Sequence, residues 1–293
     1  MIDLEQLINE KNAADEQWRA KRQAERENVT ELQDVEVTAI TTTPEAYAHY
    51  LNMQADNFSY SSGNVALVMI QMPEATVFGT QERWRSMGRF VLDSEQAEGV
   101  SIFARSPNGK GYSITNAYDI TQTSGKEMKP QLQLKDGTKE MGEALKILMN
   151  YSTVPTTVNR ELPVPAYYDQ QRMTLFINPQ YSNSESFAAI ATEVAHSRFH
   201  QKGFNGDYLR AESDLDAQSI SYILCRRFGV NRDLPDLSGL SELYQGWTIE
   251  GRKSILDGIQ DMSKNIGRSI EKSITPLQRT IPQARRPTRH PPR

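Results

Sequence analysis

Residues 184–200 read SESFAAIATEVAHSRFH, and this stretch decides how the C-terminal half of the chain is expected to fold. Ser184 and Glu185 begin it, and apolar side chains recur along one side of a helix, at positions 187, 190, 194 and 195. The same helix carries Glu193, His196 and His200 at spacings of three and four residues. The stretch therefore predicts one amphipathic helix that brings a carboxylate and two imidazoles together.

The spacing of these side chains is close to that of a zinc-binding helix. In H-E-x-x-H, two histidines one turn apart share the ion, and the glutamate activates a water. Glu193 and His196 keep that register here, but Thr192 stands at the position of the first histidine. A hydroxyl is a poor substitute for an imidazole as a zinc ligand. We therefore expect a degraded site that holds zinc at low occupancy.

Two ligand sets remain open at this stage. In one, His196 acts with an acid from the next predicted helix, which reads ESDLDAQSISYILCRRFGV; the candidate acids are Glu212, Asp214 and Asp216. In the other, His196 and His200 hold the ion together, because they lie one turn apart. An active site of this kind would use Glu193 as the catalytic base. The alternative is that Glu193 and His196 form only a hydrogen-bonded pair in a domain retained for its shape.

The N-terminal half predicts helices followed by short strands. Residues 1 to about 32 are rich in charge and predict a mostly exposed helix. A second helix should follow Thr43 and Pro44, and a third should run from Ser61 or Ser62 to Pro73. Four runs with polar or glycine punctuation then predict strands, namely TVFG, RFVL, GVSIFA and YSITNAYDI.

The order of these elements predicts an α+β fold. We expect a charged N-terminal helix at 1–34, an α+β domain at 35–128 and a polar linker at 129–145. A mostly helical domain with a small sheet should occupy 146–275. The tail at 276–293 holds five Arg, five Pro and no acid, and such a composition predicts disorder. Its arginines are a second candidate for contact with nucleic acid.

Composition limits the classes of protein to consider. The net charge is −4, from 33 bases and 37 acids, which excludes a strongly basic overall field but not a local basic groove. One cysteine, Cys225, excludes an internal disulfide framework and fits the reducing cytoplasm. It lies in the apolar run ISYILC, so we expect a buried thiol. No apolar run is long enough for a membrane span, and the charged N-terminus predicts no signal peptide.

Several motifs occur in order along the N-terminal half: YSSGNVALVMIQMPEAT, WRSMGR, VSIFA and YDITQTSG. Together they resemble the DNA-binding domain of ArdC-type antirestriction proteins and their LtrC-like relatives on conjugative plasmids and other mobile elements. In the C-terminal half, ATEVAHSRFH and the following acidic helix stand where that family has its zincin-like metallopeptidase helices. Matching the LC dipeptide of this second helix favours Asp214 as the acidic ligand, beside His196 and His200.

The resemblance implies a domain that binds single-stranded DNA. Such binding needs cations for phosphates and aromatic faces for bases. Within the stretch of the motifs, the residues of these types that we expect to contact DNA are Tyr60, Arg83, Trp84, Arg85 and Arg89. A packing role for Trp84, with arginine stems around it, is the competing interpretation. The chain also departs from the family at LDSEQAEG, where an acidic loop replaces a basic one and predicts weaker binding.

The preferred hypothesis is an antirestriction-like protein of a mobile element. It would bind single-stranded DNA, carry a degenerate zincin-like domain with weak or no peptidase activity, and act on a host restriction protein or another DNA-bound protein. One alternative is an active zinc metallopeptidase directed at DNA-bound proteins. Another is a non-catalytic adaptor in which both domains bind proteins.

Overall fold

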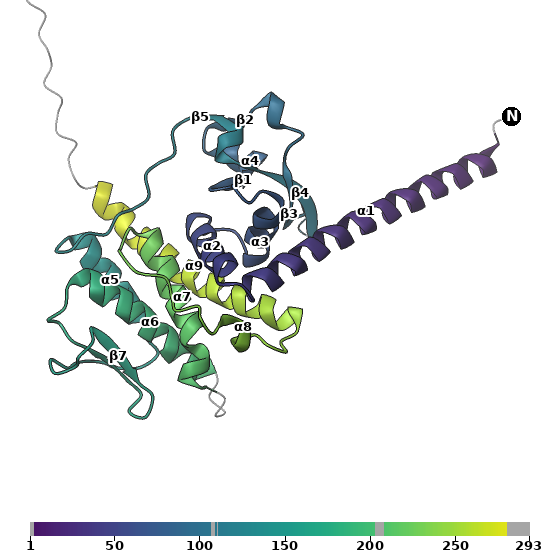
Figure 1. Cartoon of the computed structure of the whole chain (residues 1–293). Helices are drawn as coiled ribbons and strands as arrows, with labels where there is room; N and C mark the ends of the chain where they lie inside the picture. Colours follow the sequence, from purple (N-terminus) through teal and green to yellow (C-terminus); the bar gives the residue numbers. More distant parts are fainter. Residues whose placement is uncertain (1–2, 107–108, 110, 203–207, 280–293) are drawn as a thin grey trace, which may run out of the picture. The chain divides into compact units, whose positions relative to one another are not determined.

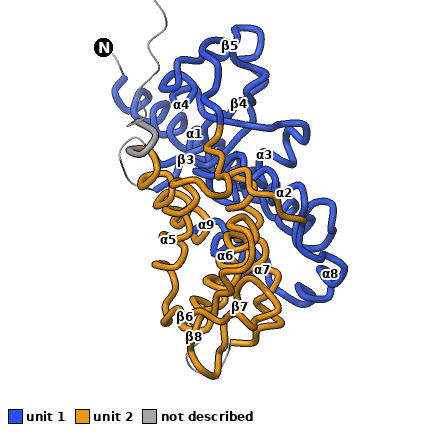
Figure 2. The backbone as a smooth tube through the Cα atoms, turned by 90° about the vertical axis from the view of Figure 1, so that its left-hand side faces the viewer, with its two compact units in different colours: residues 1–130, 234–261 blue, residues 131–233, 262–293 orange. Residues whose placement is uncertain are grey.

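The structure is a computed structural model of the whole chain, and it describes residues 3–106, 109, 111–202 and 208–279 (Figure 1). The chain divides into two compact units (Figure 2). Unit 1 comprises residues 1–130 and 234–261, and unit 2 comprises residues 131–233 and 262–293. Each unit is therefore built from two separate stretches of sequence.

Three helices open unit 1: α1 (Leu4–Ile40), α2 (Pro44–Asp56) and α3 (Ser62–Gln71). Thr43 precedes α2 with Pro44 in its first turn, and the Ser61 side chain accepts a hydrogen bond from the Asn64 N–H to cap α3. Most of α1 is exposed up to residue 28, whereas Val29, Val37 and Ile40 are buried. The helix thus joins the core of unit 1 only through its C-terminal third.

The sheets of unit 1 are small. One has the antiparallel order β1 (Phe78–Thr80), β4 (Tyr112–Asp119), β3 (Val100–Arg105), and the other pairs β2 (Arg89–Val91) with β5 (Thr123–Gly125). The short helix α4 (Gln81–Ser86) lies between β1 and β2 and carries the buried Trp84. The indole of Trp84 packs with Val91 and Tyr118 and donates a hydrogen bond to the Tyr118 carbonyl at 2.9 Å.

The outer edge of β3 is paired with side chains instead of another strand. Asn64 donates to the Phe103 carbonyl at 2.8 Å and accepts from the Phe103 N–H at 3.0 Å. Two turns further along α3, Gln71 does the same with Ser101, at 2.9 Å and 3.0 Å. Two amides on one helix thus satisfy the exposed backbone groups of a sheet edge, which would otherwise be open to pairing with another chain.

A buried carboxylate fixes the opposite end of the same sheet. Asp119 is only 2% exposed and accepts hydrogen bonds from the backbone N–H groups of Thr76, Val77 and Thr121, at 2.7, 3.1 and 2.9 Å. With Gln122 it also forms a capping box over the turn that follows β4. The aspartate in the YDITQTSG motif is therefore a structural residue that holds the loop before β1 against the end of β4.

Unit 1 is completed by residues far along the chain. Helix α8 (Leu240–Leu243) and the part of α9 (Ile249–Arg279) before residue 262 belong to it. Gln260 donates to the Tyr60 carbonyl at 2.9 Å, and Arg252 donates to the Thr41 hydroxyl at 2.6 Å. The sequence predicts one C-terminal domain over 146–275, whereas residues 234–261 pack with unit 1. Local sequence patterns cannot predict hydrogen bonds between residues so far apart in the chain.

Unit 2 combines three helices with a three-stranded sheet. Its helices are α5 (Lys139–Tyr151), α6 (Asn183–Lys202) and α7 (Arg210–Arg227), and the part of α9 from residue 262 onward also belongs to this unit. Its sheet has the order β6 (Thr156–Val158), β8 (Thr174–Ile177), β7 (Ala166–Asp169), with β6 parallel and β7 antiparallel to β8. Gly229 follows α7 in the left-handed conformation, at φ 64°, as expected for a glycine that ends a helix.

The α+β class expected from the sequence is confirmed by this mixture of helices and small sheets. The element boundaries differ in places. Helix α1 continues through the boundary expected at residue 34, and α5 begins at Lys139, inside the expected linker. Helix α9 runs to Arg279, so the first four residues of the expected tail are helical, and residues 280–293 lie outside the described residues. In the described part of the chain, no helix has the length and apolar character needed to cross a membrane.

The amide that pairs with β3 generates the first prediction. Replacing Asn64 by Ala leaves the N–H and carbonyl of Phe103 without their partners, and this should lower the free energy of unfolding by about 1–3 kcal/mol. Chemical denaturation followed by circular dichroism measures the change. Asn12→Ala is the matched control, because Asn12 is exposed in the middle of α1 and its loss should be neutral or slightly stabilising. Equal stability of the two variants would contradict a role for Asn64 at the sheet edge.

Candidate functional site

Helix α6 places the three predicted site residues of unit 2. The helix starts at a local cap, in which Glu185 accepts hydrogen bonds from the backbone N–H and the hydroxyl of Ser182, at 2.9 and 2.6 Å. Farther along, Glu193 is 6% exposed, and His196 is fully buried. Both groups must therefore find hydrogen-bonding partners within the protein.

Glu193 is held by three hydrogen bonds. Its Oε2 accepts from the backbone N–H of Tyr168 in β7 at 2.8 Å. Arg210, the first residue of α7, donates to both carboxylate oxygens, at 3.0 Å to Oε2 and 2.6 Å to Oε1. This two-point pairing is the strongest geometry available to a carboxylate and a guanidinium. Glu193 therefore joins α6, β7 and α7 at one point.

The charge on Arg210 is secure in this position. Burial acts to lower the pKa of Arg210, but the hydrogen bonds and charge of Glu193 outweigh it, so the pKa lies above its usual value. The guanidinium also lies over the ring of Tyr167, at 5.1 Å from the centroid. The permanent positive charge of Arg210 thus balances the negative charge of the Glu193 carboxylate. With both oxygens engaged, Glu193 is not free to accept a proton from a water.

His196 is held from both sides of its ring. Its Nε2 lies 3.1 Å from Asp214 Oδ1, and its Nδ1 lies 2.9 Å from the hydroxyl of Tyr208. The neutral tautomer with its proton on Nε2 satisfies both contacts, because Asp214 can then accept and Tyr208 can donate. Burial raises the pKa of Tyr208 to about 12, so this phenol keeps the proton that it donates.

Asp214 stays ionised beside His196. The hydrogen bond from His196 lowers the pKa of Asp214 below its usual value, and the bond from Gln218 adds to this against the opposing effect of burial. Gln218 donates to Asp214 Oδ2 at 2.5 Å from the next turn of α7. Each carboxylate oxygen of Asp214 therefore has a hydrogen-bonding partner, His196 at Oδ1 and Gln218 at Oδ2.

His200 has a separate set of contacts. Its Nδ1 lies 2.6 Å from the hydroxyl of Tyr168, and its ring stacks on Tyr208 with centroids 4.8 Å apart. The ring of Tyr208 also packs edge-on against His196. The aromatic ring of Tyr208 thus contacts both imidazoles, and each imidazole has hydrogen-bonding partners of its own.

The residues present do not fit a three-ligand zinc site. The Thr192 hydroxyl, at the position of the first histidine, donates to the Ala188 carbonyl at 3.2 Å. Of the expected ligands, only His196 and Asp214 bring potential metal-binding atoms close together, since Glu193 is paired with Arg210 and His200 with Tyr168. Among the described residues, no three His, Cys, Asp or Glu side chains form a group suited to a metal ion. Structural and catalytic zinc sites both need at least three protein ligands.

Three partners of this site were not predicted from the sequence: Arg210, Tyr208 and Tyr168. Arg210 could have been predicted as a site residue, because it shares one face of α7 with Asp214 and Gln218 at a spacing of four residues. Tyr208 precedes the helix, and Tyr168 comes from a strand in another part of the sequence. Their positions depend on the packing of unit 2, which no spacing in the chain reveals.

The predicted DNA-contact residues of unit 1 divide into three groups. Arg83 is exposed on α4 and lies over the ring of the half-buried Tyr60, at 5.4 Å from its centroid. Arg89 is engaged by the protein, donating to Thr123 Oγ1 at 2.8 Å and to the Lys126 carbonyl at 2.7 Å. Arg85 is exposed and lines a cavity that none of the other four residues lines. These five residues therefore do not form one surface.

Trp84 needs correction as a candidate for base stacking. Its side chain is fully buried, its indole N–H is satisfied by the Tyr118 carbonyl, and the Arg89 guanidinium lies 6.0 Å from the ring centroid. A ring without an exposed face cannot stack on a base, so Trp84 is a core residue in this structure. The packing interpretation of the Arg-Trp cluster accounts for Trp84 and Arg89, and only Arg83 and Arg85 present exposed guanidinium groups.

The cavity beside Arg85 has a volume of about 530 Å³. Arg85, Lys126 and Lys129 line it together with a single acid, Glu127, and a serine, a glycine and two methionines complete the wall. The exposed ring of Phe90 belongs to the adjoining strand β2. Lys126 was not among the residues expected to contact DNA, and Lys129 lies in the stretch expected to be a linker.

The pairing of Glu193 with Arg210 generates the second prediction. Arg210→Met leaves a carboxylate buried without its cation and should destabilise the protein by about 3 kcal/mol. Adding Glu193→Gln should recover a large part of this loss, because the amide needs no counter-charge and still accepts from the Tyr168 N–H. Denaturation of the two single variants and the double variant measures the coupling. Additive losses would show that the two side chains do not interact.

Comparisons with known proteins place the fold. No protein-family model matches the chain. An uncharacterized protein of Bacillus anthracis, pXO2-81, is 21% identical over a 312-residue alignment that covers 87% of this chain and 53% of that protein. The chain thus spans about half the length of this curated relative.

Two crystal structures of the antirestriction protein ArdC from plasmid R388 are similar to the chain. The metal-free form has a TM-score of 0.51 and 14% sequence identity, and the match covers 85% of this chain and 98% of ArdC. The Mn(II)-bound form has a TM-score of 0.49 and 16% identity, covering 83% and 97%. The match to the metal-free form extends over most of both chains, and the chain therefore has the fold of the antirestriction protein ArdC.

Proposed function

We propose that the chain is an antirestriction-like protein of a mobile genetic element that binds single-stranded DNA through unit 1. The observation that carries this proposal is the cationic cavity beside Arg85, which has three bases and one acid on its wall in a chain of net charge −4. Likeness of fold to a plasmid antirestriction protein supports the biological setting. Basic side chains beside an exposed aromatic ring are the elements from which single-strand sites are built.

Unit 2 is assigned a binding role without peptidase chemistry. A zincin-type mechanism needs a metal with an open position and a carboxylate free to take a proton. In this chain Thr192 replaces one ligand, and Arg210 holds both oxygens of Glu193. We infer that unit 2 keeps the shape of a metallopeptidase and serves to contact a host restriction protein or another protein bound to DNA. An active metallopeptidase and a pure protein adaptor are the alternatives that the following measurements exclude or support.

The DNA-binding proposal predicts charge-dependent binding at the Arg85 cavity. Arg85→Glu combined with Lys129→Glu should weaken binding of single-stranded DNA by the full chain about tenfold or more at moderate salt, similarly for all sequences, because phosphate contacts carry no base information. Fluorescence anisotropy with a labelled oligonucleotide measures the affinity.

Lys146→Glu is the control for this measurement, because Lys146 is exposed on α5 in unit 2 and its charge reversal changes the net charge in the same direction. The control should bind like the parent. If the parent chain binds no single-stranded DNA at low salt, the proposal fails, and a pure adaptor becomes the better description.

The degraded metal site predicts less than one tightly bound zinc per chain. Thr192→His places a second imidazole one turn before His196 and should raise zinc occupancy. The gain should disappear in Thr192→His/Asp214→Ala and persist in Thr192→His/Asp216→Ala, since Asp214 already lies 3.1 Å from His196. Metal analysis of the purified protein decides the outcome. Stoichiometric zinc in the parent, lost on His200→Ala, would identify His196 and His200 as a genuine site.

A further inference from the structure

Two cavities of unit 1 share lining residues with each other, and neither shares a residue with the cavity beside Arg85. The first, of about 400 Å³, lies at the start of α3, and the second, of about 420 Å³, lies between α1 and the β3–β4 hairpin. Arg26 and Tyr112 line both cavities. The two hollows are therefore adjoining parts of one groove, which runs along α1 from Trp18 to Gln33. We call it the α1 groove.

One stripe of α1 forms the floor of this groove. Trp18, Arg22, Arg26 and Thr30 recur every four residues, so they share one face of the helix. The guanidinium of Arg22 lies over the ring of Trp18, at 5.5 Å from its centroid. Trp18 was not among the residues expected from the sequence to contact DNA. The repeat places one aromatic ring and two guanidinium groups in a row along the groove.

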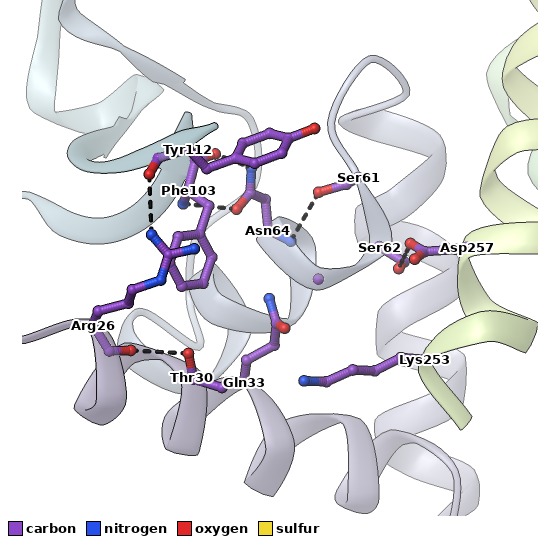
Figure 3. Close-up of a pocket in the computed structure, with 11 residues that line it drawn as sticks. Arg26, Thr30, Gln33, Ser61, Ser62, Asn64, Phe103, Tyr112, Lys253 and Asp257 are labelled. Atoms are coloured by element: carbon purple, nitrogen blue, oxygen red, sulfur yellow. Dashed lines mark hydrogen bonds between the residues drawn. The ribbon is translucent and has the colours of Figure 1, made fainter. Parts of the chain in front are cut away.

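The opposite wall is held in a fixed position. Arg26 donates to the Tyr112 carbonyl at 3.1 Å, and its guanidinium lies over Phe103 at 5.7 Å from the ring centroid (Figure 3). Phe103 is in turn fixed by its two hydrogen bonds with Asn64. Figure 3 shows the ring of Tyr112 at the rim of the cavity, on the same side as Phe103 and Asn64. Arg26 therefore connects the floor of the α1 groove to its wall.

The aromatic faces along the groove are open to solvent. Trp18 is 62% exposed and Tyr112 is 58% exposed. Trp84, by contrast, has no exposed surface. The two rings in the α1 groove therefore have the free faces that base stacking requires, whereas the tryptophan of the Arg-Trp cluster does not.

The charge of the groove is positive. Residues 19–26 read RAKRQAER, with four bases and one acid, in a chain where acids outnumber bases. Arg22 is 3.7 Å from Glu25, a distance at which an exposed pair contributes little and leaves the guanidinium available. At the far end, Lys253 is paired with Asp34, and Ser62 with Asp257, so this end is closer to neutral. The cationic part lies where the exposed rings lie.

We propose that a single strand of DNA lies along the α1 groove, with its phosphates on Arg19, Arg22 and Arg26 and its bases stacked on Trp18 and Tyr112. This inference rests on the proposed function of unit 1 and adds a second surface to it, separate from the cavity at Arg85. A cationic path interleaved with open aromatic faces is the pattern that binds single strands without sequence preference. A duplex keeps its bases stacked on one another, so it cannot use the two rings.

The test uses the full chain and a thymidine oligonucleotide of about 15 nucleotides, a length within the range of known single-strand sites. Trp18→Ala and Tyr112→Ala should each weaken binding roughly 5- to 100-fold, the range for losing one stacked base. Arg22→Glu should weaken binding and reduce the slope of log affinity against log salt by about 0.7, as expected for one phosphate contact on a single strand. Lys21→Glu is the matched control, since it makes the same charge change on the same helix outside the groove.

Tryptophan fluorescence gives a second readout that does not depend on affinity. The chain has three tryptophans, and stacking on a base should quench Trp18. Quenching on addition of the oligonucleotide should persist in Trp247→Phe and disappear in Trp18→Phe. Circular dichroism of each variant checks the fold; Trp18, Lys21 and Arg22 are exposed on α1, so their replacement should leave it intact.

The outcomes separate this inference from the proposed function. If Trp18→Ala, Tyr112→Ala and Arg22→Glu bind like the parent while Arg85→Glu/Lys129→Glu loses binding, the α1 groove is not a DNA site and the proposed function stands. If the groove variants lose binding and Lys21→Glu does not, the inference is supported. If the parent binds no single-stranded DNA, both proposals fail together. Equal binding of duplex and single strand, without quenching of Trp18, would also overturn the inference.

Discussion

Polar side chains complete the backbone hydrogen bonding of the three-stranded sheet in unit 1, where the edge strand β3 has no neighbouring strand on its outer side. Asn64 and Gln71 pair with the edge of β3, and Asp119 gathers three N–H groups at the other end of the sheet. Each unpaired buried backbone group would cost free energy comparable to a lost hydrogen bond. The amides and the carboxylate therefore help to determine where α3 and the β3–β4 hairpin lie, and the α1 groove is lined in part by these elements.

The same constraint explains the chemistry of unit 2. A buried carboxylate is retained only with a cation or several donors, and Glu193 has both. In a metallopeptidase, the ion supplies the positive charge of the site. Here the charge comes from Arg210, a group that cannot bind a water or polarise a carbonyl as a Lewis acid does. The buried charge of Glu193 is therefore balanced within the protein, and the same hydrogen bonds join α6, β7 and α7.

The sequence predicted local structure better than the site. Caps and breakers such as Ser61, Thr43 and Pro73 located α2 and α3, and the alternating runs located β3 and β4, because these signals act over a few residues. Strand β6 was not predicted, because its three exposed residues form no pattern. At the site, the spacing along one helix brought Glu193 and His196 together in the prediction, but the partners Tyr168 and Tyr208 depend on contacts between distant segments. Trp84 was placed on the surface because composition cannot distinguish an aromatic ring in the core from one at an interface.

The interleaving of the two units has a consequence for how the chain can be made and divided. Residues 131–233 of unit 2 stand between the two parts of unit 1, and residues 262–293 of unit 2 follow the second part. During synthesis, unit 1 cannot complete its core until residue 261 has left the ribosome, long after its strands have been made. Neither unit can be transferred by recombination as one uninterrupted gene segment. A change that ends the chain before residue 261 therefore removes part of each unit.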